Sequence, residues 1–252
     1  MRALEWIEHA KTTIEKIQKS QSQNIKEAAS IMANSIAAER WVHTFGCGHA
    51  TLPVEEMYPR IGGFVGFHPV IELPLSFFTH IIGDMGINQF VFLERIEGYG
   101  QQIMKSYNLH PDDTMWIFSH SGINNVNIDV ALYAKKVGMK VIATGSVEEF
   151  RNKKSRHSSG KNLFEIADVT IDTCVPAQDA VIEIENHIDR IAPLSTLAFI
   201  TVVWTTIITV AEILVEKGVK LFIHPSHNIP GDNNVMQRLQ SAINEYRRRL
   251  KV

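Results

Sequence analysis

The chain has 252 residues, of which 45% are hydrophobic and 21% are charged. This composition can supply a core large enough for independent folding, and it excludes a mainly disordered protein. With 25 basic and 27 acidic residues, the net charge is −2, which excludes the basic field that attracts nucleic acid or an anionic membrane. Cys47 and Cys174 fit neither a disulfide framework nor a paired-cysteine metal site, and no apolar signal segment is apparent at the N-terminus. We therefore expect a cytoplasmic protein that binds neither nucleic acid nor membrane.

The first predicted elements are helices within residues 2–38. Isoleucines recur there near helical spacing, and the polar stretch 20–24 interrupts them, which indicates two helices or one kinked helix. From residue 41 onward, short apolar runs alternate with helical stretches, the pattern of an α/β fold. Strands are predicted at 41–45, 63–67, 114–118, 140–144 and 169–172. Helices are predicted between them at 52–61, 86–107, 125–137 and 163–167.

Five strands joined through helices must be largely parallel, because parallel neighbours need crossover connections. Such a sheet is covered on both faces, and ligands collect at its carboxyl edge, where the strand order reverses. No repeat or linker divides the chain. We therefore expect one domain over 1–252, with N-terminal helices over 1–38 and an α/β core with a C-terminal helix over 39–252.

Residues 191–211 form an uncharged apolar segment about as long as a membrane span. Six hydroxyl side chains lie within it, Pro193 stands near its start, and Glu212 follows it directly. These features favour a helix buried on all sides in the core or in a subunit interface.

A turn rich in hydroxyl and amide side chains follows the predicted strand at 114–118. It contains Ser119, His120, Ser121, Gly122, Asn124 and Asn125. Backbone N–H groups at a helix start carry partial positive charge, and these side chains add further donors, so the turn predicts a phosphate site. The turn lacks the P-loop and dinucleotide-binding glycine patterns. The alternative is ordinary capping of the next helix by Ser121 or Asn124.

A second turn of this kind follows the first predicted strand. Gly46 and Gly48 allow the backbone to approach a ligand closely, and His49 stands beside them. Glu55 and Glu56 come about two turns into the next helix, where one carboxylate can face the ligand. An ordinary surface helix would carry the same pair, so both interpretations stay open.

Four segments together resemble the sugar isomerase (SIS) domain family, and within it a phosphoheptose-isomerase-like branch. They are 46–49 with the glutamates at 55 and 56, the turn 119–124, the segment 192–196, and the segment 226–232. The resemblance extends over residues 5–245. It implies a flavodoxin-like three-layer sandwich, a phosphorylated sugar as ligand, and a homodimer or homotetramer whose active sites share residues between subunits.

The resemblance also implies a binding site. The phosphate would lie on the turn, at Ser119, Ser121, Gly122, Asn124 and Asn125, with His120 inside the same turn. Gly48 and His49 would contact the sugar. A polar cluster at 156–161 is predicted to line the mouth of the site through Ser158 and Ser159, and the alternative is a solvated loop.

Catalytic roles follow from the same resemblance. Glu55 or Glu56 would be the base that moves a proton, although phosphoheptose isomerases have these glutamates further along the helix. His227, which in relatives often comes from a neighbouring chain, would open the sugar ring. Glu185 is a competing acid–base candidate, because some arabinose-phosphate isomerases of the family carry a glutamate there.

The histidine spacing at 224–227, with Asp232, could hold zinc. Two histidines in a segment rich in proline and glycine are more often part of a loop, so we expect no metal, and the chemistry requires no organic cofactor. The favoured function is an aldose–ketose isomerase that acts on a sugar phosphate through an enediolate, an intramolecular oxidoreductase. The alternatives are a non-catalytic phosphosugar sensor and a lyase or etherase that acts on a phosphorylated amino sugar.

Overall fold

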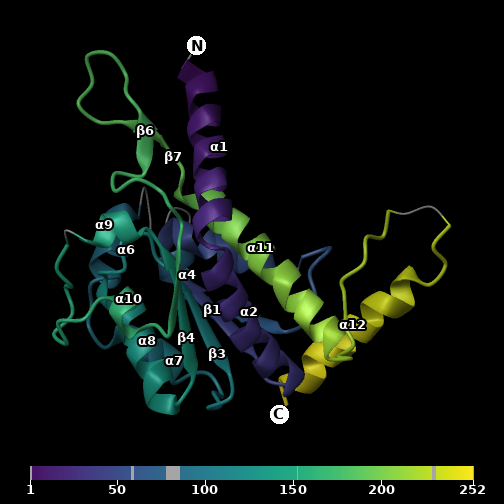
Figure 1. The fold of residues 1–252 in the computed structure, drawn as a ribbon. Coiled ribbons are helices and arrows are strands. Elements are labelled where there is room, and N and C mark those ends of the chain that lie inside the picture. The colour runs from purple at the N-terminus through teal and green to yellow at the C-terminus, as the bar shows by residue number, and fades with distance from the viewer. Residues whose placement is uncertain (1, 58–59, 78–85, 152, 229–230, 252) are drawn as a thin grey trace.

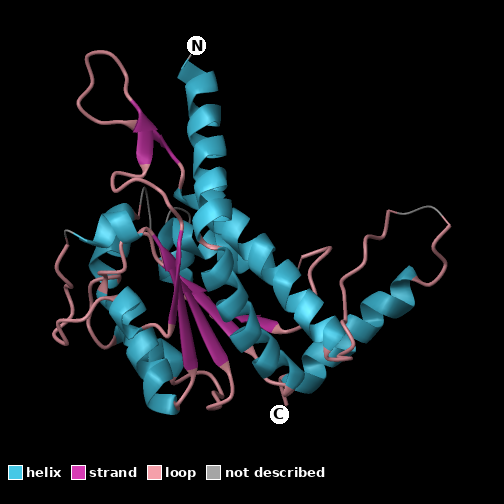
Figure 2. Cartoon of the chain, viewed as in Figure 1, coloured by secondary structure: helices cyan, strands magenta, loops and turns pink. Residues whose placement is uncertain are grey.

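In the computed structural model the described residues are 2–57, 60–77, 86–151, 153–228 and 231–251 (Figure 1). Within them, one sheet has five parallel strands in the order β2-β1-β3-β4-β5. These strands are β1 (Val42–Gly46), β2 (Phe67–Pro69), β3 (Thr114–Phe118), β4 (Lys140–Gly145) and β5 (Val169–Asp172). A separate antiparallel pair, β6 (Ala180–Ile182) and β7 (Ile191–Pro193), extends away from the sheet (Figure 2).

Helices cover both faces of the sheet, which gives three layers (Figure 1). One face carries α2 (Ser22–Ala37) and α11 (Ser195–Glu216), and α1 (Arg2–Ser20) continues past the sheet toward β6. The other face carries α7 (Tyr99–Met104), α8 (Asn125–Val137) and α10 (Leu163–Ile166). The remaining described helices are η1 (Gly48–Thr51), α3 (Leu52–Met57), α4 (Leu73–Ser76), α6 (Ile87–Leu93), α9 (Val147–Arg151) and α12 (Val235–Arg249).

The core follows from side-chain alternation along the strands. In β3, Met115 and Ile117 join the apolar cluster that contains Val130 of α8. Trp116 and Phe118 point to the opposite face and join the cluster built with α2 and α11. All five residues of β3 are buried, as expected for the central strand of a sheet covered on both sides.

The predicted α/β class and the five-stranded parallel sheet are confirmed. The strands at 114–118 and 169–172 and the helix at 125–137 have the predicted bounds. The two helices predicted within 2–38 are also present, as α1 and α2. Of the helix predicted at 52–61, α3 covers 52–57, and residues 58–59 lie outside the described part of the chain.

Two predicted elements differ from the structure. The single helix predicted at 86–107 is instead α6 and α7, because Gly98 between them adopts a left-handed backbone with φ of 88°. The strand predicted at 63–67 begins only at Phe67. Residues 63–65 bond instead to the segment before α12, where Val65 N donates to Phe222 O at 3.0 Å.

The long apolar helix α11 is buried along one side rather than all round. It packs on α2 and is the one helix of the described residues long and apolar enough to cross a membrane. Only 44% of its most apolar window is buried. Burial on all sides in the core, one of the two expected placements, is therefore wrong, because Ile208 and Val215 are 56% and 62% exposed. Burial in a subunit interface stays a prediction.

Candidate functional site

The strand order of the sheet reverses between β1 and β3. Here β2 lies on one side of β1 and β3 on the other, so the strand order reverses, and a crevice opens at the carboxyl ends of such strands. A cavity of about 340 Å³ lies at this point. Its lining comes mainly from the turns after β1, β3 and β4 and from the start of α11. The sheet topology therefore positions the candidate site.

The turn after β3 is held in shape by its own first serine. Ser119 is buried, and its Oγ accepts hydrogen bonds from Gly122 N at 3.1 Å and from Asn127 Nδ2 at 3.4 Å. Gly122 adopts a φ of 67°, which favours glycine, and an added Cβ would meet the ring of Phe164 at 2.4 Å. Ser119 thus shapes the turn, while Ser121 lines the cavity with a partly exposed side chain.

Helix α8 begins at this turn without a side-chain cap. Asn124 stands at the N-cap position with an extended backbone, yet its side chain accepts no hydrogen bond from the helix. Its Nδ2 donates to Glu94 Oε2 at 2.7 Å, and its Oδ1 accepts from Arg156 Nη1. No side-chain hydrogen bond therefore caps the start of α8. Val126 N of its first turn donates to Glu94 O at 3.2 Å, and the positive end of the helix adjoins the cavity at Asn124 and Asn127.

Two cationic side chains line the same cavity. Arg156 and Lys153 both come from the segment after β4 and α9, and Lys153 also pairs with the buried carboxylate of Glu149. Arg156 and the start of α8 bring positive charge to one side of the cavity, where Arg156 Nη1 also donates to Asn124 Oδ1. This arrangement suits an anion with several oxygens, such as a phosphate.

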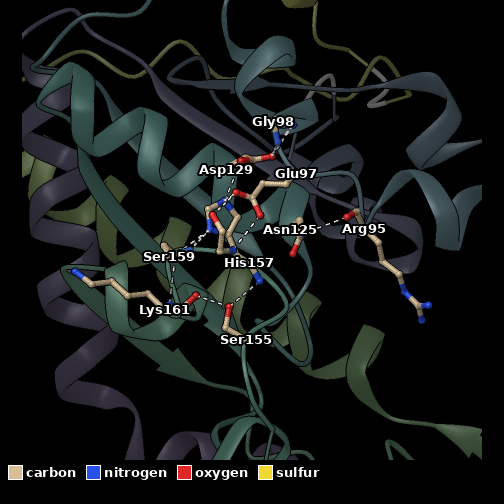
Figure 3. Close-up of polar contacts among 11 residues, drawn as sticks. Arg95, Glu97, Gly98, Asn125, Asp129, Ser155, His157, Ser159 and Lys161 are labelled. Atoms are coloured by element: carbon tan, nitrogen blue, oxygen red, sulfur yellow. Dashed lines mark hydrogen bonds and ion pairs between the residues drawn. The ribbon is translucent and has the colours of Figure 1, made fainter.

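Next to Arg156 in the chain, His157 anchors this segment to α8 (Figure 3). The ring contacts Asp129 of α8, with Nε2 3.2 Å from Oδ1, and Ser159 Oγ, 2.9 Å from Nδ1. The next residue, Ser158, donates its backbone N–H to Glu97 at 2.9 Å. Hydrogen bonds from Ser158 lower the pKa of Glu97, whereas burial raises the pKa of Asp129. These contacts hold the segment against α8 and fix where Arg156 enters the cavity.

Among the described residues, three carboxylates line the cavity, and their surroundings differ. Asp179 accepts from the backbone N–H groups of Leu194 and Ser195 and from Ser195 Oγ, and so caps α11. Glu149 pairs with Lys153. Glu94 has the uncharged amide of Asn124 as its hydrogen-bond donor, and burial raises the pKa of its carboxyl, against the lowering effects of Asn124 and two arginines.

Cys47 and His120 also line the cavity. The thiol of Cys47 lies 3.7 Å from Asn127 Oδ1, and burial, with the nearby charge of Glu94, raises its pKa well above the usual range. The ring nitrogens of His120 are covered and have no hydrogen-bond partner among the described residues. A covered polar group without a partner is costly, so a ligand or water is expected to supply one.

The structure brings several of the predicted binding residues together. Those that line the cavity are Gly48, His49, Ser119, His120, Ser121 and Asn124. Gly122 supports the turn, and Asn125 donates from its side chain to Arg95 O at 2.7 Å. Ser158 and Ser159 do not line the cavity, because they are bonded to Glu97 and His157 on the outer side of the segment.

None of the four predicted catalytic residues lines the cavity. Glu56 accepts from Trp204 Nε1 at 3.1 Å and pairs with Arg60 at 2.7 Å, and Glu55 precedes it on α3. Glu185 is exposed between β6 and β7, and His227 is exposed before α12. Their predicted roles stay predictions, since a second subunit could bring some of them to the site.

The possible zinc site at 224–232 has no matching geometry in the described residues. Residues 229–230 of this segment lie outside them. His224 is buried, His227 is exposed, and Asp232 pairs with Arg238, whose hydrogen bond lowers the pKa of the carboxyl. Over the described ranges, no group of three histidine, cysteine or acidic side chains is placed to hold a metal.

Sequence reasoning missed Glu94, Glu149, Lys153 and Asp179. Glu94 ends a short helix that carried no distinctive pattern, and only contacts to α8 bring it to the cavity. Asp179 comes just before β6, and its carboxylate accepts a hydrogen bond from Ser195 N at the start of α11, after β7. The β6–β7 pair therefore separates the two residues in the sequence. A polar cluster at 156–161 was recognised, but its cavity-lining member is Arg156 rather than its serines.

The chain is similar to a known family and to known proteins along most of its length. Residues 5–146 match the SIS domain family. A UPF0309 protein of Thermoanaerobacter pseudethanolicus is 34% identical over 98% of both chains. A UPF0309 protein of Oceanobacillus iheyensis is 34% identical, over 88% of this chain and 89% of its own.

Solved structures share the fold at low sequence identity. A phosphoheptose isomerase from Neisseria gonorrhoeae has a TM-score of 0.56 at 13% identity, over 83% of this chain and 97% of its own. A phosphoheptose isomerase from Francisella tularensis has a TM-score of 0.51 at 14% identity, over 84% and 97%.

Proposed function

The chain belongs to the SIS domain family, and from that premise we propose that it is an aldose–ketose isomerase that acts on a sugar phosphate. One observation carries the proposal: the cavity joins an uncapped helix start and two cations to buried carboxylates, at the reversal point of the sheet. A volume of about 340 Å³ is in the range of small-molecule sites. A phosphosugar has an anionic phosphate and a polar carbon chain. The cavity offers cationic and N–H groups for the phosphate, and carboxylates and other polar groups for the carbon chain.

The phosphate end of the ligand is proposed to lie between Ser121, the start of α8 and Arg156. Charge-assisted hydrogen bonds to a dianion are stronger than those between neutral groups, and an arginine can donate two at once. The sugar would then extend toward Gly48 and His49, which lie across the cavity after β1. Neighbouring carboxylates would serve the proton transfers between C1 and C2.

A thermal-shift screen tests the binding step. Pentose, hexose and heptose phosphates should raise the melting temperature in a concentration-dependent way, whereas the same sugars without phosphate should not. Arg156→Gln should weaken the response by about tenfold in concentration. Arg151→Gln is the matched control, because Arg151 is exposed on α9 and does not line the cavity. Equal responses to phosphorylated and plain sugars would contradict the proposed phosphate site.

Hydrogen exchange separates catalysis from binding alone. An isomerase in deuterated water should incorporate deuterium at C2 or C1 of the sugar phosphate that it converts, because the proton passes through the enzyme. Binding without exchange would identify a sensor instead. Release of an acid from a phosphorylated amino sugar would identify a lyase or etherase.

The exposed side of α11 is proposed to face a second copy of the chain. A groove of about 360 Å³ runs between α1, α2 and α11, lined by Ile14, Ile17 and Ile25 beside three threonines of α11. Exposed apolar side chains extend this face along α11 at Ile208 and Val215. Ile208→Lys should shift the sedimentation coefficient toward that of a monomer, and an unchanged value would contradict the proposal.

A further inference from the structure

The carboxylates predicted to act as the base, at Glu55, Glu56 and Glu185, do not line the cavity. The proposed isomerase therefore needs another base. We infer that Glu94 is the base that moves the carbon-bound proton, in place of Glu55 or Glu56. This inference rests on the proposed function and deepens it. It depends on the position of Glu94, on its fixed geometry relative to the anion site, and on the surroundings of the competing carboxylates.

Glu94 is attached to the start of α8 by three hydrogen bonds that involve it or its neighbour. Asn124 Nδ2 donates to its carboxylate at 2.7 Å, and Val126 N donates to its backbone carbonyl at 3.2 Å. Asn125 Nδ2 donates to Arg95 O at 2.7 Å, as Figure 3 shows. The carboxylate and the anion site therefore form one unit. A sugar held by its phosphate would have its carbon chain at a fixed distance from this base.

Glu94 lines the same cavity as the turn after β1. Its charge is close enough to Cys47 to contribute to the raised pKa of that thiol. Cys47 and Gly48 line the side of the cavity where the sugar is proposed to extend. Glu94 thus lines the same cavity as the anion site and the proposed sugar side, and C1 and C2 of a phosphorylated chain bound there would lie in that cavity with it.

The surroundings of Glu94 suit a base better than those of the other cavity carboxylates. Asp179 accepts three hydrogen bonds at the start of α11, and Glu149 is paired with Lys153. Glu94 is only 9% exposed and has an amide donor on one oxygen. Burial raises the pKa of Glu94 above the ordinary glutamate value, and a base with a pKa nearer neutrality removes a carbon-bound proton more effectively.

The step balances without any further reactant. The Glu94 carboxylate takes the proton from C2 of the open-chain aldose. The electron pair of the broken C–H bond forms the C1=C2 double bond and leaves a negative charge on the C1 oxygen, which takes the proton of the neighbouring C2 hydroxyl. The negative charge now on the C2 oxygen re-forms a carbonyl at C2, and the electron pair of the C1=C2 bond takes the proton back from the Glu94 carboxyl onto C1. The product is an isomer of the substrate, and Glu94 ends as it began.

The decisive experiment compares Glu94→Gln with Glu148→Gln. Glu148 is exposed on the adjacent α9 and does not line the cavity, so its variant controls for the loss of a glutamate charge. The probe is the member of a pentose, hexose and heptose phosphate panel that wild-type protein exchanges with deuterated water. Glu94→Gln should lower the exchange rate by at least about a hundredfold, and the same sugar phosphate should still raise its melting temperature. Glu148→Gln should keep the wild-type exchange rate.

A second variant guards against a fold effect. Glu94→Ala should recover part of its exchange rate when formate is added, because a small carboxylate can occupy the vacated space and accept the proton. Exchange by Glu94→Gln at the wild-type rate would overturn the assignment of the base alone. Loss of exchange in Glu56→Gln or Glu55→Gln, with Glu94→Gln active, would return the role to α3. Absence of exchange with every panel member in wild-type protein would overturn the proposed function itself, and the base with it.

Discussion

At the amino edge of the sheet the ring of His43 contacts two partners, whereas at the carboxyl edge neither ring nitrogen of His120 has a hydrogen-bond partner in the described part of the chain. His43 Nε2 lies 3.2 Å from Asp113 Oδ2, and His43 Nδ1 lies 3.1 Å from His68 Nδ1. The covered nitrogens of His120 have no partner among the described residues. Buried polar groups that serve only the fold are normally paired, so the difference separates a structural edge from a binding edge.

The same contrast holds for the acidic side chains. Asp113, at the amino edge, accepts from Trp41 N, His110 N and the His43 ring, and these donors keep the pKa of its carboxyl below the usual range despite burial. Glu94, at the carboxyl edge, has a raised pKa because burial outweighs its donors. The amino edge stabilises the charged form of Asp113, whereas the carboxyl edge leaves Glu94 better able to accept and release a proton.

The largest expected effect is at the amino edge. Asp113→Ala removes the acceptor of Trp41 N and His110 N and the partner of His43 Nε2. The free energy of unfolding should fall by about 3–5 kcal/mol, measured by urea denaturation. Ligand-induced stabilisation at the carboxyl edge should persist at temperatures where the variant is folded. A loss below about 1 kcal/mol would contradict the structural role of this edge.

The pH dependence of stability tests the amino edge a second way. Burial, aided by the charge of His43, lowers the pKa of His68 from 6.5 to about 4. Between these values the unfolded chain binds more protons than the folded one, so acidification favours unfolding. The contribution is fully present above pH 6.5, and about 3 kcal/mol should be lost as the pH falls through 4. His68→Asn should remove that part of the pH dependence, and identical curves for both proteins would contradict it.

Gly122→Ala tests the shape of the turn at the carboxyl edge. Alanine at a φ of 67° is strained, and its Cβ would meet the Phe164 ring at 2.4 Å. We expect a stability loss of about 2 kcal/mol and weaker binding of sugar phosphates. Gly160→Ala is the matched control, because Gly160 has a φ of 70° and nothing within 4 Å of the added Cβ. Equal effects of the two substitutions would show that contact with Phe164 is unimportant.

The smallest expected effect belongs to a single hydroxyl. Ser121→Ala should weaken sugar phosphate binding by about 1–2 kcal/mol, the contribution of one charge-assisted hydrogen bond, and should leave stability nearly unchanged. Titration calorimetry with a panel member measures it. Ser106→Ala provides the comparison and should bind as the wild type does, because Ser106 is exposed after α7 and does not line the cavity.

The sheet and the turn after β3 were predictable because their signals are local. Strand β3 is an unbroken apolar run, and the hydroxyl and amide residues follow it directly, so neighbouring residues in sequence determine both elements. Parallel connection then restricted the site to the carboxyl edge.

The base and the apolar face were not predictable in this way. Glu94 reaches the cavity through hydrogen bonds to Asn124 and Val126, about thirty residues later in the chain, and no periodicity encodes such contacts. Glu55 and Glu56 carried the stronger local pattern, but Trp204 and Arg60 take up the carboxylate of Glu56. The one-sided burial of α11 likewise depends on which partners pack against it.

Helix α11 contributes to two places at once. Its first turn, at Ser195 and Phe199, lines the cavity, and its outer side presents Ile208 to the proposed second copy. A ligand that repositions the first turn would alter the free energy of association by the same amount as association alters ligand affinity, since the coupling is reciprocal. The apparent affinity for the ligand would then depend on protein concentration. If the coupling is favourable, dilution and ligand removal would both shift the protein toward the unassociated form.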